Sequence, residues 1–457
     1  MKLWRKNILA GWEEQAFEYE FESLKLMNCL IFLCNTPESV QFAFSSHNAS
    51  FERKSAPYRH YLIPLVGDGL FVSDGEIWRK RRRIVAPIIH LARLPDFAPT
   101  MVNTALEVRD RWAKLLPGTE IDVLTDMAHL TAEIICRTIF GSKLGREHAA
   151  DVVRGFADYQ RHITKIDFIT LFGLPDWLPR WYSRPLRAAV RRIYAVLDHV
   201  IESSRRRHDR DDVSIIGRLL EARDQDSGAA LDTDALRHEA AVLLMAGHET
   251  TANTLAWAWY LLSQMPEVEA RLHAEVDQVL GERTPTLADV PKLVYTRAIL
   301  EETMRLYPPV PIMSRETLND EVYNDTSIPK GSIIIVAPWL LHRHKKLWPK
   351  PDHFIPERFL PGGDGPISKF AYIPFSIGPR ICAGMAFGLT EAILSMSTLA
   401  QSFKLRLKPG HRIEMECHLT LRPGETLPMS LHRRSRQPSA ASDIAAAMSP
   451  LTCPMGH

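Results

Sequence analysis

Apolar residues repeat with the period of an α-helix along most of the chain. Amphipathic stretches of this kind cover residues 104–116, 125–140, 184–207 and 266–280, with proline or glycine between them. The longest stretch, residues 233–264, has no internal proline and is apolar around most of its circumference. At about 1.5 Å per residue this helix would cross a whole domain, and its apolar surface has to be covered on nearly every side. The pattern therefore predicts a long central helix with other helices packed around it.

Predicted strands are few and lie towards the two ends of the chain. Residues 17–22 alternate apolar and polar side chains with period two, and residues 26–34 form a second strand-like run. A helix start follows at residues 36–39, where a capping threonine, a proline and an acid stand together. Further short strands are predicted at residues 332–336, 403–407 and 415–421. The fold class that follows is mainly α with a minor β part.

The totals of the sequence favour one large domain. The chain has 457 residues, 46% of them hydrophobic, which is enough for a sizeable core. No internal repeat and no linker interrupt residues 1–433, so we expect a single domain there. Residues 434–457 are rich in serine, alanine and proline, and we expect them to form a disordered tail.

Charge and cysteine content argue against several classes of protein. The 56 basic residues nearly balance the 54 acidic ones, so the net charge of +2 gives no general attraction for nucleic acid. The six cysteines form no CxxC pair or histidine cluster, which argues against a zinc finger or a disulfide framework. No apolar run approaches the roughly 18 residues that a membrane anchor needs. We therefore expect a cytoplasmic protein, in which a reduced cysteine stays available to bind a metal.

The strongest chemical motif is Phe-Ser-Ile-Gly-Pro-Arg-Ile-Cys-Ala-Gly at residues 375–384, directly before a predicted helix. Because Cys382 precedes that helix, free N–H groups and the helix dipole should stabilise its thiolate, lower its pKa and favour metal binding. Phe375 is placed to shield the sulfur from water, and Arg380 to bind a carboxylate of a cofactor. Gly384 would let a flat cofactor approach closely.

A lone cysteine beside a glycine-rich turn would more often be buried and structural. Here the cysteine comes with fixed residues on both sides. A chance match to five fixed residues in a chain of this length has odds on the order of one in ten thousand. The combined spacing therefore favours a metal ligand.

A second motif stands in the middle of the long central helix. Residues 246–251 read Ala-Gly-His-Glu-Thr-Thr, and glycine and threonine are mediocre residues for the interior of a helix. A zinc site of the HExxH kind does not fit, because position 252 is Ala252. A local opening of the helix that leaves room for a small ligand and water is one explanation. A purely structural kink is the other.

With these motifs the sequence resembles the cytochrome P450 family, whose cysteine loop has the pattern Phe-x-x-Gly-x-Arg-x-Cys-x-Gly. Further motifs stand in the family's order from about residue 17 to residue 431. Glu302 and Arg305 are three residues apart and share a helix face, and Pro-Glu-Arg-Phe follows at residues 356–359. The resemblance implies that Arg358 joins this pair in a buried network that supports the core on the haem side.

For the fold, the resemblance implies the triangular, helix-rich P450 prism, with haem b between the long central helix and the helix after the cysteine loop. It also implies that the thiolate of Cys382 binds the haem iron. Trp78 and Arg82 are four residues apart on one helix face, and the resemblance places them and Arg315 against the haem propionates. The expected cofactor-binding residues are Trp78, Arg82, Arg315, Phe375, Arg380, Cys382 and Gly384.

For the activity, the resemblance implies a monooxygenase that inserts one oxygen atom from O2 into an apolar substrate such as a terpenoid, a fatty acid or a steroid. Glu249 and Thr250 would be the catalytic pair that delivers protons. No flavin or nicotinamide fingerprint is present, so electrons should come from an external ferredoxin or flavodoxin. The expected substrate pocket comprises Leu243, Ala246, Val310, Ile312 and Met313.

Several alternatives stay open at the level of sequence. A haem-thiolate peroxygenase or isomerase would need no electron donor, and a haem gas sensor would have no enzymatic activity. The apolar, proline-bounded loop at residues 171–179 is either a lid over the substrate's path or a loop packed on its own helices. The basic run at residues 79–83 is either a solvated surface or a docking patch for an acidic electron-transfer protein.

Overall fold

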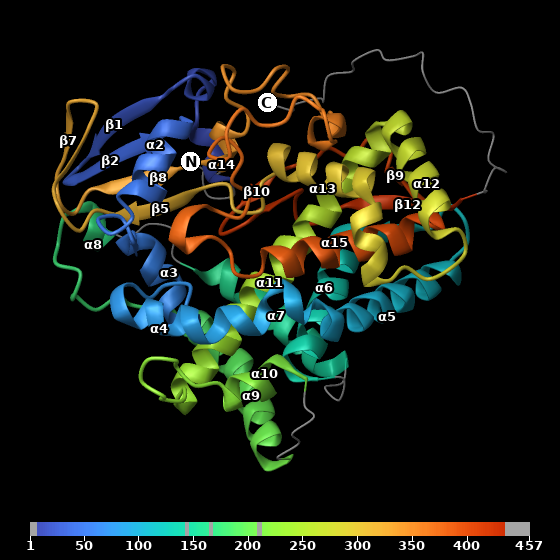
Figure 1. Ribbon diagram of the computed structural model, residues 1–457, viewed down its shortest axis with the longest axis horizontal. Coiled ribbons are helices and arrows are strands. Elements are labelled where there is room, and N and C mark those ends of the chain that lie inside the picture. The colour runs from blue at the N-terminus through green and yellow to red at the C-terminus, as the bar shows by residue number, and fades with distance from the viewer. Residues whose placement is uncertain (1–6, 142–145, 164–167, 208–212, 435–457) are drawn as a thin grey trace.

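The computed structural model describes residues 7–141, 146–163, 168–207 and 213–434, and it is mainly helical with a strand-rich region at one edge (Figure 1). The helices in chain order are α2 (Pro37–Gln41), α3 (Ala56–Val66), α4 (Gly75–Val85), α5 (Leu94–Ala113), α6 (Val123–Phe140), α7 (Arg146–His162), α8 (Phe168–Leu171), α9 (Arg184–Arg207), α10 (Ile215–Glu221), α11 (Thr233–Gln264), α12 (Pro266–Leu280), α13 (Val294–Leu306), α14 (Pro338–Leu341) and α15 (Met385–Ala400). The strands are β1 (Phe21–Leu26), β2 (Cys29–Cys34), β3 (Arg53–Lys54), β4 (Glu120–Asp122), β5 (Met313–Glu316), β6 (Glu321–Tyr323), β7 (Thr326–Ile328), β8 (Ile333–Val336), β9 (Phe403–Leu407), β10 (Glu416–Cys417), β11 (Leu421–Arg422) and β12 (Pro428–Arg433). The predicted fold class, mainly α with a minor β part, is confirmed.

Helix α11 is the centre of the helical region, as its apolar circumference predicted. It has the predicted bounds and packs against α6, α9, α13 and α15. Trp257 and Trp259 lie two residues apart, hence on different sides of the helix, and both are fully buried. The other helices therefore cover α11 on opposite sides. Neither α11 nor any other helix among the described residues is long and apolar enough to cross a membrane.

The first two strands lie at one edge of a five-stranded sheet with the order β1-β2-β8-β5-β3. β2 and β8 pair in parallel, and the other neighbours pair antiparallel. The prediction of a strand at residues 17–22 is wrong in its position. Asn35 donates side-chain hydrogen bonds to the carbonyl oxygens of Ala16 and Tyr19, at 3.3 and 2.9 Å, and holds that segment beside the sheet. β1 starts later and turns into β2 at Met27, whose φ is 55°.

Other predicted elements are found with small shifts. The Thr36 hydroxyl accepts a hydrogen bond from the backbone N–H of Ser39 at 3.2 Å and so caps α2 as predicted. β9 has its predicted bounds and pairs with β12. The predicted strand at residues 415–421 is instead two short strands, β10 and β11, that pair with each other. Residues 435–457, nearly all of the predicted tail, lie outside the described residues.

A buried ion pair ties α13 to the chain segment that leads to the cysteine loop. Arg305 donates to the two carboxylate oxygens of Glu302 at 2.7 and 2.8 Å, and both side chains are fully buried. The same guanidinium donates to backbone carbonyl oxygens of three residues between 342 and 353. Arg358 Nε lies 3.4 Å from Glu302 Oε1. The predicted network of Glu302, Arg305 and Arg358 is therefore confirmed.

We expect Arg305→Ala to lower the free energy of unfolding by about 3–5 kcal/mol, because it leaves the Glu302 carboxylate buried without its partner. Urea unfolding followed by circular dichroism measures this loss. Arg297→Ala is the matched control on the same helix, since the Arg297 side chain is 56% exposed and its pair with Glu301 should contribute about 1 kcal/mol or less. Equal losses in the two variants would contradict a structural role for the buried pair.

Candidate functional site

A cavity of about 290 Å³ lies between α11 and α15, and most of its wall is apolar. Further parts of the wall come from α3, α4, α6, α7, α10, α13, β3, β5 and the loop before α15. The structure brings nearly all of the predicted site residues together here, although they come from distant parts of the chain. Those on the wall are Trp78, Arg82, Leu243, Ala246, Glu249, Thr250, Val310, Met313, Arg315, Phe375, Arg380, Cys382 and Gly384.

The predicted pocket residue Ile312 does not lie on this wall. It packs against the main apolar core of the protein, whereas its neighbour Met313, the first residue of β5, lines the cavity. Whether Ile312 contacts a substrate stays a prediction, because an apolar run in the sequence does not reveal which of its residues face the cavity.

The loop before α15 is a tight turn that needs glycine. Gly378 has a φ of 74°, and a Cβ there would lie 1.9 Å from the carbonyl oxygen of Phe44. The backbone N–H of Cys382 donates to the carbonyl oxygen of Phe375 at 2.9 Å, which closes the turn. Gly384 then stands at the N-cap of α15. The loop thus fixes Cys382 directly before the N-terminus of this helix, as the motif predicted.

The Cys382 side chain is open towards the cavity rather than packed into the core. Burial raises the pKa of its thiol above the usual value, and the backbone N–H of Gly384 and the charge of Arg82 oppose that rise without cancelling it. The prediction of a lowered pKa is therefore wrong for the protein by itself, since the loss of hydration outweighs the helix terminus. A metal ion bound at the sulfur would reverse the balance, because a coordinating thiol is deprotonated outright.

Buried arginines surround the same cavity. Arg315 is 4% exposed, and its Nη1 has no hydrogen-bond partner among the described residues. Burial, with a further contribution from Arg380, lowers the pKa of Arg315 to about 9. Arg380 donates to the backbone carbonyl oxygens of Glu52 and Ser73, and its guanidinium lies 4.8 Å from the ring centroid of Trp78. Burial lowers the pKa of Arg380 to about 10.

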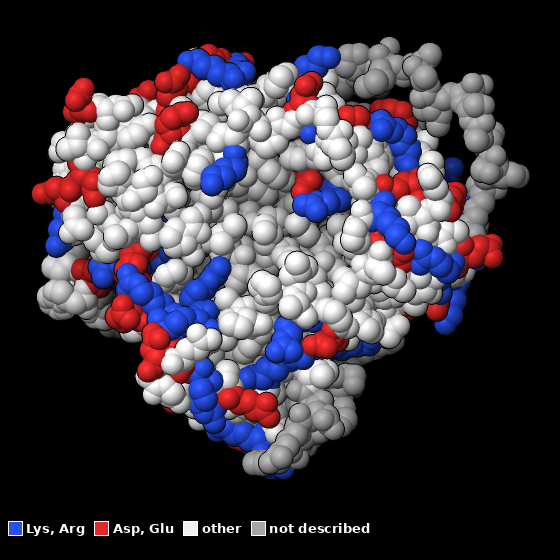
Figure 2. Space-filling view, viewed as in Figure 1, with Lys and Arg blue, Asp and Glu red and all other residues white. Residues whose placement is uncertain are grey.

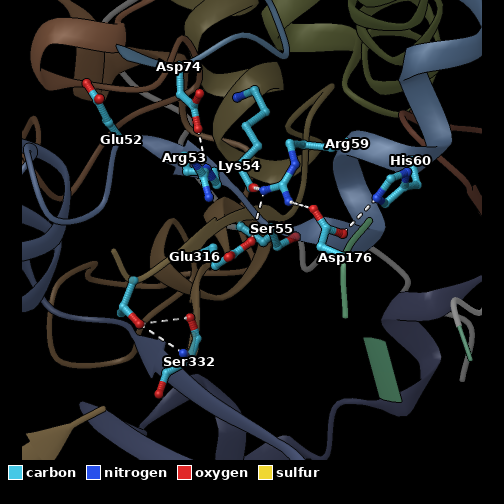
Figure 3. Close-up of polar contacts among 12 residues, drawn as sticks. Glu52, Arg53, Lys54, Ser55, Arg59, His60, Asp74, Asp176, Glu316 and Ser332 are labelled. Atoms are coloured by element: carbon cyan, nitrogen blue, oxygen red, sulfur yellow. Dashed lines mark hydrogen bonds and ion pairs between the residues drawn. The ribbon is translucent and has the colours of Figure 1, made fainter. Parts of the chain in front are cut away.

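Lys54 is a residue of the cavity wall that the sequence did not single out. Its Nζ lies 4.5 Å from the ring centroid of Phe71. The neighbouring Arg53 and Arg59 bind carboxylates, whereas Lys54 Nζ makes no ion pair with a described residue (Figure 3). Burial, together with the charges of two nearby arginines, holds the pKa of Lys54 well below its usual value.

The excess of positive charge on this wall favours the binding of an anion. Lys54, Arg82, Arg315 and Arg380 line the cavity, and the carboxylate on the same wall, Glu249, is paired with another arginine. Buried charges are costly unless an opposite charge compensates them. A ligand that carries two carboxylates and a metal would supply partners for these cations and for the Cys382 sulfur. The residues therefore fit haem b, the cofactor expected from the sequence.

The predicted catalytic pair lies on the cavity side of α11. Glu249 Oε1 lies 3.0 Å from Arg422 Nη2, and its Oε2 accepts a hydrogen bond from Gln160 Nε2. Thr250 Oγ1 donates to the carbonyl oxygen of Ala246 at 2.7 Å, within the helix. The acid and the alcohol are thus next to each other at the wall, and their part in proton transfer stays a prediction.

The motif at residues 246–251 does not break α11, which is continuous through it. A Cβ at Gly247 would lie 2.7 Å from Ile135 Cδ1, so glycine lets α6 approach closely. Thr131 of α6 donates to the carbonyl oxygen of His248 at 2.8 Å. His248 itself is buried, which lowers its pKa to about 4 and leaves it neutral at neutral pH. Part of the unusual composition is therefore explained by the contact between the two helices.

The loop at residues 171–179 is fastened to α3. Asp176 accepts hydrogen bonds from Arg59 at 2.6 Å and pairs with His60 at 2.8 Å (Figure 3). These contacts, that with His60 first, hold the pKa of the Asp176 carboxyl well below its usual value. Since α3 also lines the cavity through Tyr58, the loop is fastened to a helix of the pocket wall, although none of its described residues lines the cavity itself. Its role as a lid stays a prediction.

The basic run at residues 79–83 is largely paired within the chain. Arg79 pairs with glutamates, and Arg81 and Arg83 pair with aspartates. Acidic side chains accordingly lie among the basic ones on the face that contains α4 (Figure 2). This favours an ordinary surface over a docking patch for an acidic protein.

Glu391 is a second buried acid near the cavity that the sequence did not single out. It is fully buried on α15, and neither of its oxygens makes a hydrogen bond of ordinary geometry with a described residue. Burial raises the pKa of its carboxyl well above the usual value, and the nearby Thr251 hydroxyl offsets this only in part. The sequence held a signal for this acid, because Glu391 is the one charged residue of α15. No sequence pattern singled out Gln160 or Arg422, since only the folding of the chain brings them to Glu249.

Comparison with known proteins agrees with this geometry. Residues 13–428 match the family model described as cytochrome P450. The chain is 33% identical to cyclooctatin synthase of Streptomyces melanosporofaciens, with 86% of this chain and 84% of that protein covered. It is 32% identical to cyclooctat-9-en-7-ol 5-monooxygenase of the same organism, with 76% and 74% covered. The crystal structure of the cytochrome P450DA heme domain superposes with a TM-score of 0.79 at 27% identity, covering 91% of this chain and 90% of that one.

Glu391→Gln is expected to stabilise the protein increasingly as the pH rises from about 5 to about 8. The folded protein keeps the Glu391 proton where the unfolded chain has lost it, so the acid opposes folding more strongly at higher pH. Each unit of raised pKa corresponds to about 1.4 kcal/mol. Melting temperatures of both proteins across this range test the trend. The exposed Glu22→Gln is the control, and a difference for Glu391→Gln that does not grow with pH would contradict a neutral buried acid.

Proposed function

The chain belongs to the cytochrome P450 family and is a haem monooxygenase, and from this premise we propose that its substrate is an apolar, terpenoid-like molecule and that a separate ferredoxin or flavodoxin supplies its electrons. Fatty acids and steroids are the other substrate classes that the pocket would suit. The observation that carries the assignment of the site is a cysteine thiol open to a cavity whose wall holds four cations, none of which forms an ion pair with a carboxylate among the described residues. The reaction is the conversion of RH, O2, two electrons and two protons into ROH and water.

The bound haem supplies the centre at which dioxygen is reduced and oxygen is transferred. In the proposal, Cys382 Sγ is the protein ligand of the iron. The side chains that would hold the two propionates are Lys54, Trp78, Arg82, Arg315 and Arg380. Their excess positive charge would be compensated there, and the Arg315 Nη1 atom would gain an acceptor.

Other side chains of the wall would receive the substrate and deliver protons. Leu243, Val310 and Met313 present apolar surface to the cavity and would keep water away from a bound substrate. The Glu249 carboxyl would take up protons and pass them to Thr250 Oγ1, its neighbour on α11. For this transfer the Thr250 hydroxyl has to exchange its hydrogen bond with the Ala246 carbonyl oxygen for one that points into the cavity.

The apolar wall supports an apolar substrate, since pockets recognise ligands mainly by burying apolar surface and orient them with a few polar groups. A relative that matches most of this chain is named for oxygen insertion into an alcohol, cyclooctat-9-en-7-ol. We therefore favour a cyclic terpenoid, with or without a hydroxyl group, over an unbranched fatty acid. A cytoplasmic location with a diffusible electron donor completes the proposal.

We expect the reduced protein treated with carbon monoxide to show the Soret band that defines this family, and we expect Cys382→Ala to abolish it. The band reports thiolate ligation of the iron, which alanine cannot provide. The absorption spectrum of the purified haem protein measures it. Cys417→Ala, which removes a buried cysteine away from the cavity, is the control and should keep the band. An unchanged band in Cys382→Ala would overturn the assignment of the metal ligand.

The substrate class can be tested with a panel of terpenoid alcohols, terpenoid hydrocarbons, fatty acids and steroids. A compound that fills the pocket should displace water from the iron and shift the Soret band, and we expect cyclic terpenoids to do so at the lowest concentration. Met313→Glu, which places a charge on the apolar wall, should weaken that response at least tenfold, because a charge buried beside an apolar ligand costs more than about 1.4 kcal/mol. A tighter response to fatty acids would refute the terpenoid assignment and leave the family unaffected.

A further inference from the structure

The carboxylate of Glu249 belongs to a closed ring of three polar side chains from three separate elements, with Gln160 on α7 and Arg422 on β11. Arg422 Nη2 lies 3.0 Å from Glu249 Oε1 and also donates to Gln160 Oε1, while Gln160 Nε2 donates to Glu249 Oε2. Turning the Gln160 amide over would set its oxygen against the carboxylate and its NH2 group against the guanidinium. Only one orientation of the amide therefore makes both of the hydrogen bonds that link Gln160 to Glu249 and Arg422.

The three members of the ring differ in where they face. Glu249 lines the cavity and is 7% exposed, whereas Gln160 and Arg422 do not line the cavity. Gln160 is 2% exposed, and the side chain of Arg422 is 23% exposed. The acid thus stands at the cavity wall with its two partners behind it, and the guanidinium reaches towards the surface. A carboxylate in such a place needs fixed partners to keep one position.

Arg422 is delivered to Glu249 by the docking of a whole strand. Glu249, Asn253 and Trp257 are four residues apart and share one face of α11. Asn253 donates to the Thr420 hydroxyl at 3.2 Å, and Trp257 Nε1 donates to a backbone carbonyl oxygen of β11, also at 3.2 Å. The register of β11 along this face sets where the guanidinium lies. Neither of these two contacts involves the Arg422 side chain. The arginine is therefore not the sole attachment of β11 to α11.

We propose that Arg422, together with Gln160, is a positioning residue for proton delivery: it holds the Glu249 carboxyl at the cavity wall in the orientation from which protons are passed on. This inference rests on the proposed function, which assigns Glu249 as the proton donor. General acids act only from a narrow range of positions. When protons arrive too slowly to complete the reaction, O2, two electrons and two protons leave as hydrogen peroxide and the substrate stays unchanged.

The test compares Arg422→Gln with the unchanged protein, using NADPH, a surrogate ferredoxin and its reductase, and the panel compound that gives the largest Soret shift. We expect the carbon monoxide band and the substrate affinity to stay within about twofold. Product formed per NADPH should fall roughly tenfold with a matching rise in peroxide, a part of the 10²–10⁴-fold that a positioned acid contributes. The solvent deuterium isotope effect on product formation should increase, because proton delivery then limits the rate.

Further variants separate positioning from a structural role. Arg422→Lys should restore part of the coupling, since lysine keeps the charge without the planar fork of donors. Adding Arg422→Gln to Glu249→Gln should cause little further loss, because both changes disable one unit. Asn253→Leu removes another contact between the same strand and the same helix and does not line the cavity. It should lower the melting temperature and leave coupling and isotope effect unchanged, because the Trp257 contact still holds β11 in register.

Two results would overturn the inference. The first is that Arg422→Gln leaves coupling and the isotope effect unchanged. The second is that Arg422→Gln loses haem or behaves like Asn253→Leu, because Arg422 would then stabilise the fold rather than position the acid. Thr250→Ala is the reference for disrupted proton delivery and should waste reducing equivalents as peroxide while it still binds haem. If the unchanged protein forms no product from any panel compound and shows no carbon monoxide band, the proposed function fails, whatever the Arg422 variants do.

Discussion

The position of the Cys382 sulfur depends on an ion pair that it does not touch. Arg305 bridges Glu302 and the backbone of residues 342–353, so α13 holds the segment that leads to the cysteine loop. That segment in turn holds the start of the loop, because the His342 side chain accepts a hydrogen bond from the backbone N–H of Ile373 at 2.9 Å, directly before the loop. A flexible loop could not hold a metal ligand in one place. The buried pair therefore stabilises the site through the backbone rather than through its own charges.

Around this sulfur the protein concentrates positive charge that has no ion-pair partner within the part of the chain that the structure describes. Burial depresses the pKa values of Arg315, Arg380 and Lys54, which shows how strongly the wall disfavours their charges in the absence of a counter-ion. An anionic cofactor that binds the folded protein removes this cost, so its binding also stabilises the fold. Haem binding and folding are thus coupled at the same cavity.

Two buried acids near the cavity differ in their hydrogen-bond partners. Glu249 has an arginine and an amide as fixed partners, whereas Glu391 has no such partner among residues 7–141, 146–163, 168–207 and 213–434, and burial raises the pKa of its carboxyl. The difference comes from the surroundings that the fold gives each side chain. Fixed partners hold a carboxyl group in one direction, and a carboxyl without them in an apolar setting stays protonated. The two acids can therefore serve different purposes although they lie on neighbouring helices.

The sequence by itself determined the elements whose signals are local. The period of the apolar residues predicted α9, α11 and α12 with their bounds, and the spacing around Cys382 and between Glu302 and Arg305 predicted the cysteine loop and the buried pair. The tertiary structure alone decided what depends on residues far apart in the chain. It packed Ile312 against the core, tied residues 16–19 to Asn35, and raised rather than lowered the pKa of Cys382 through burial. It also brought Lys54, Gln160 and Arg422 to the site. Local patterns record helix faces and turns, whereas burial and long-range pairing exist only once the chain has folded.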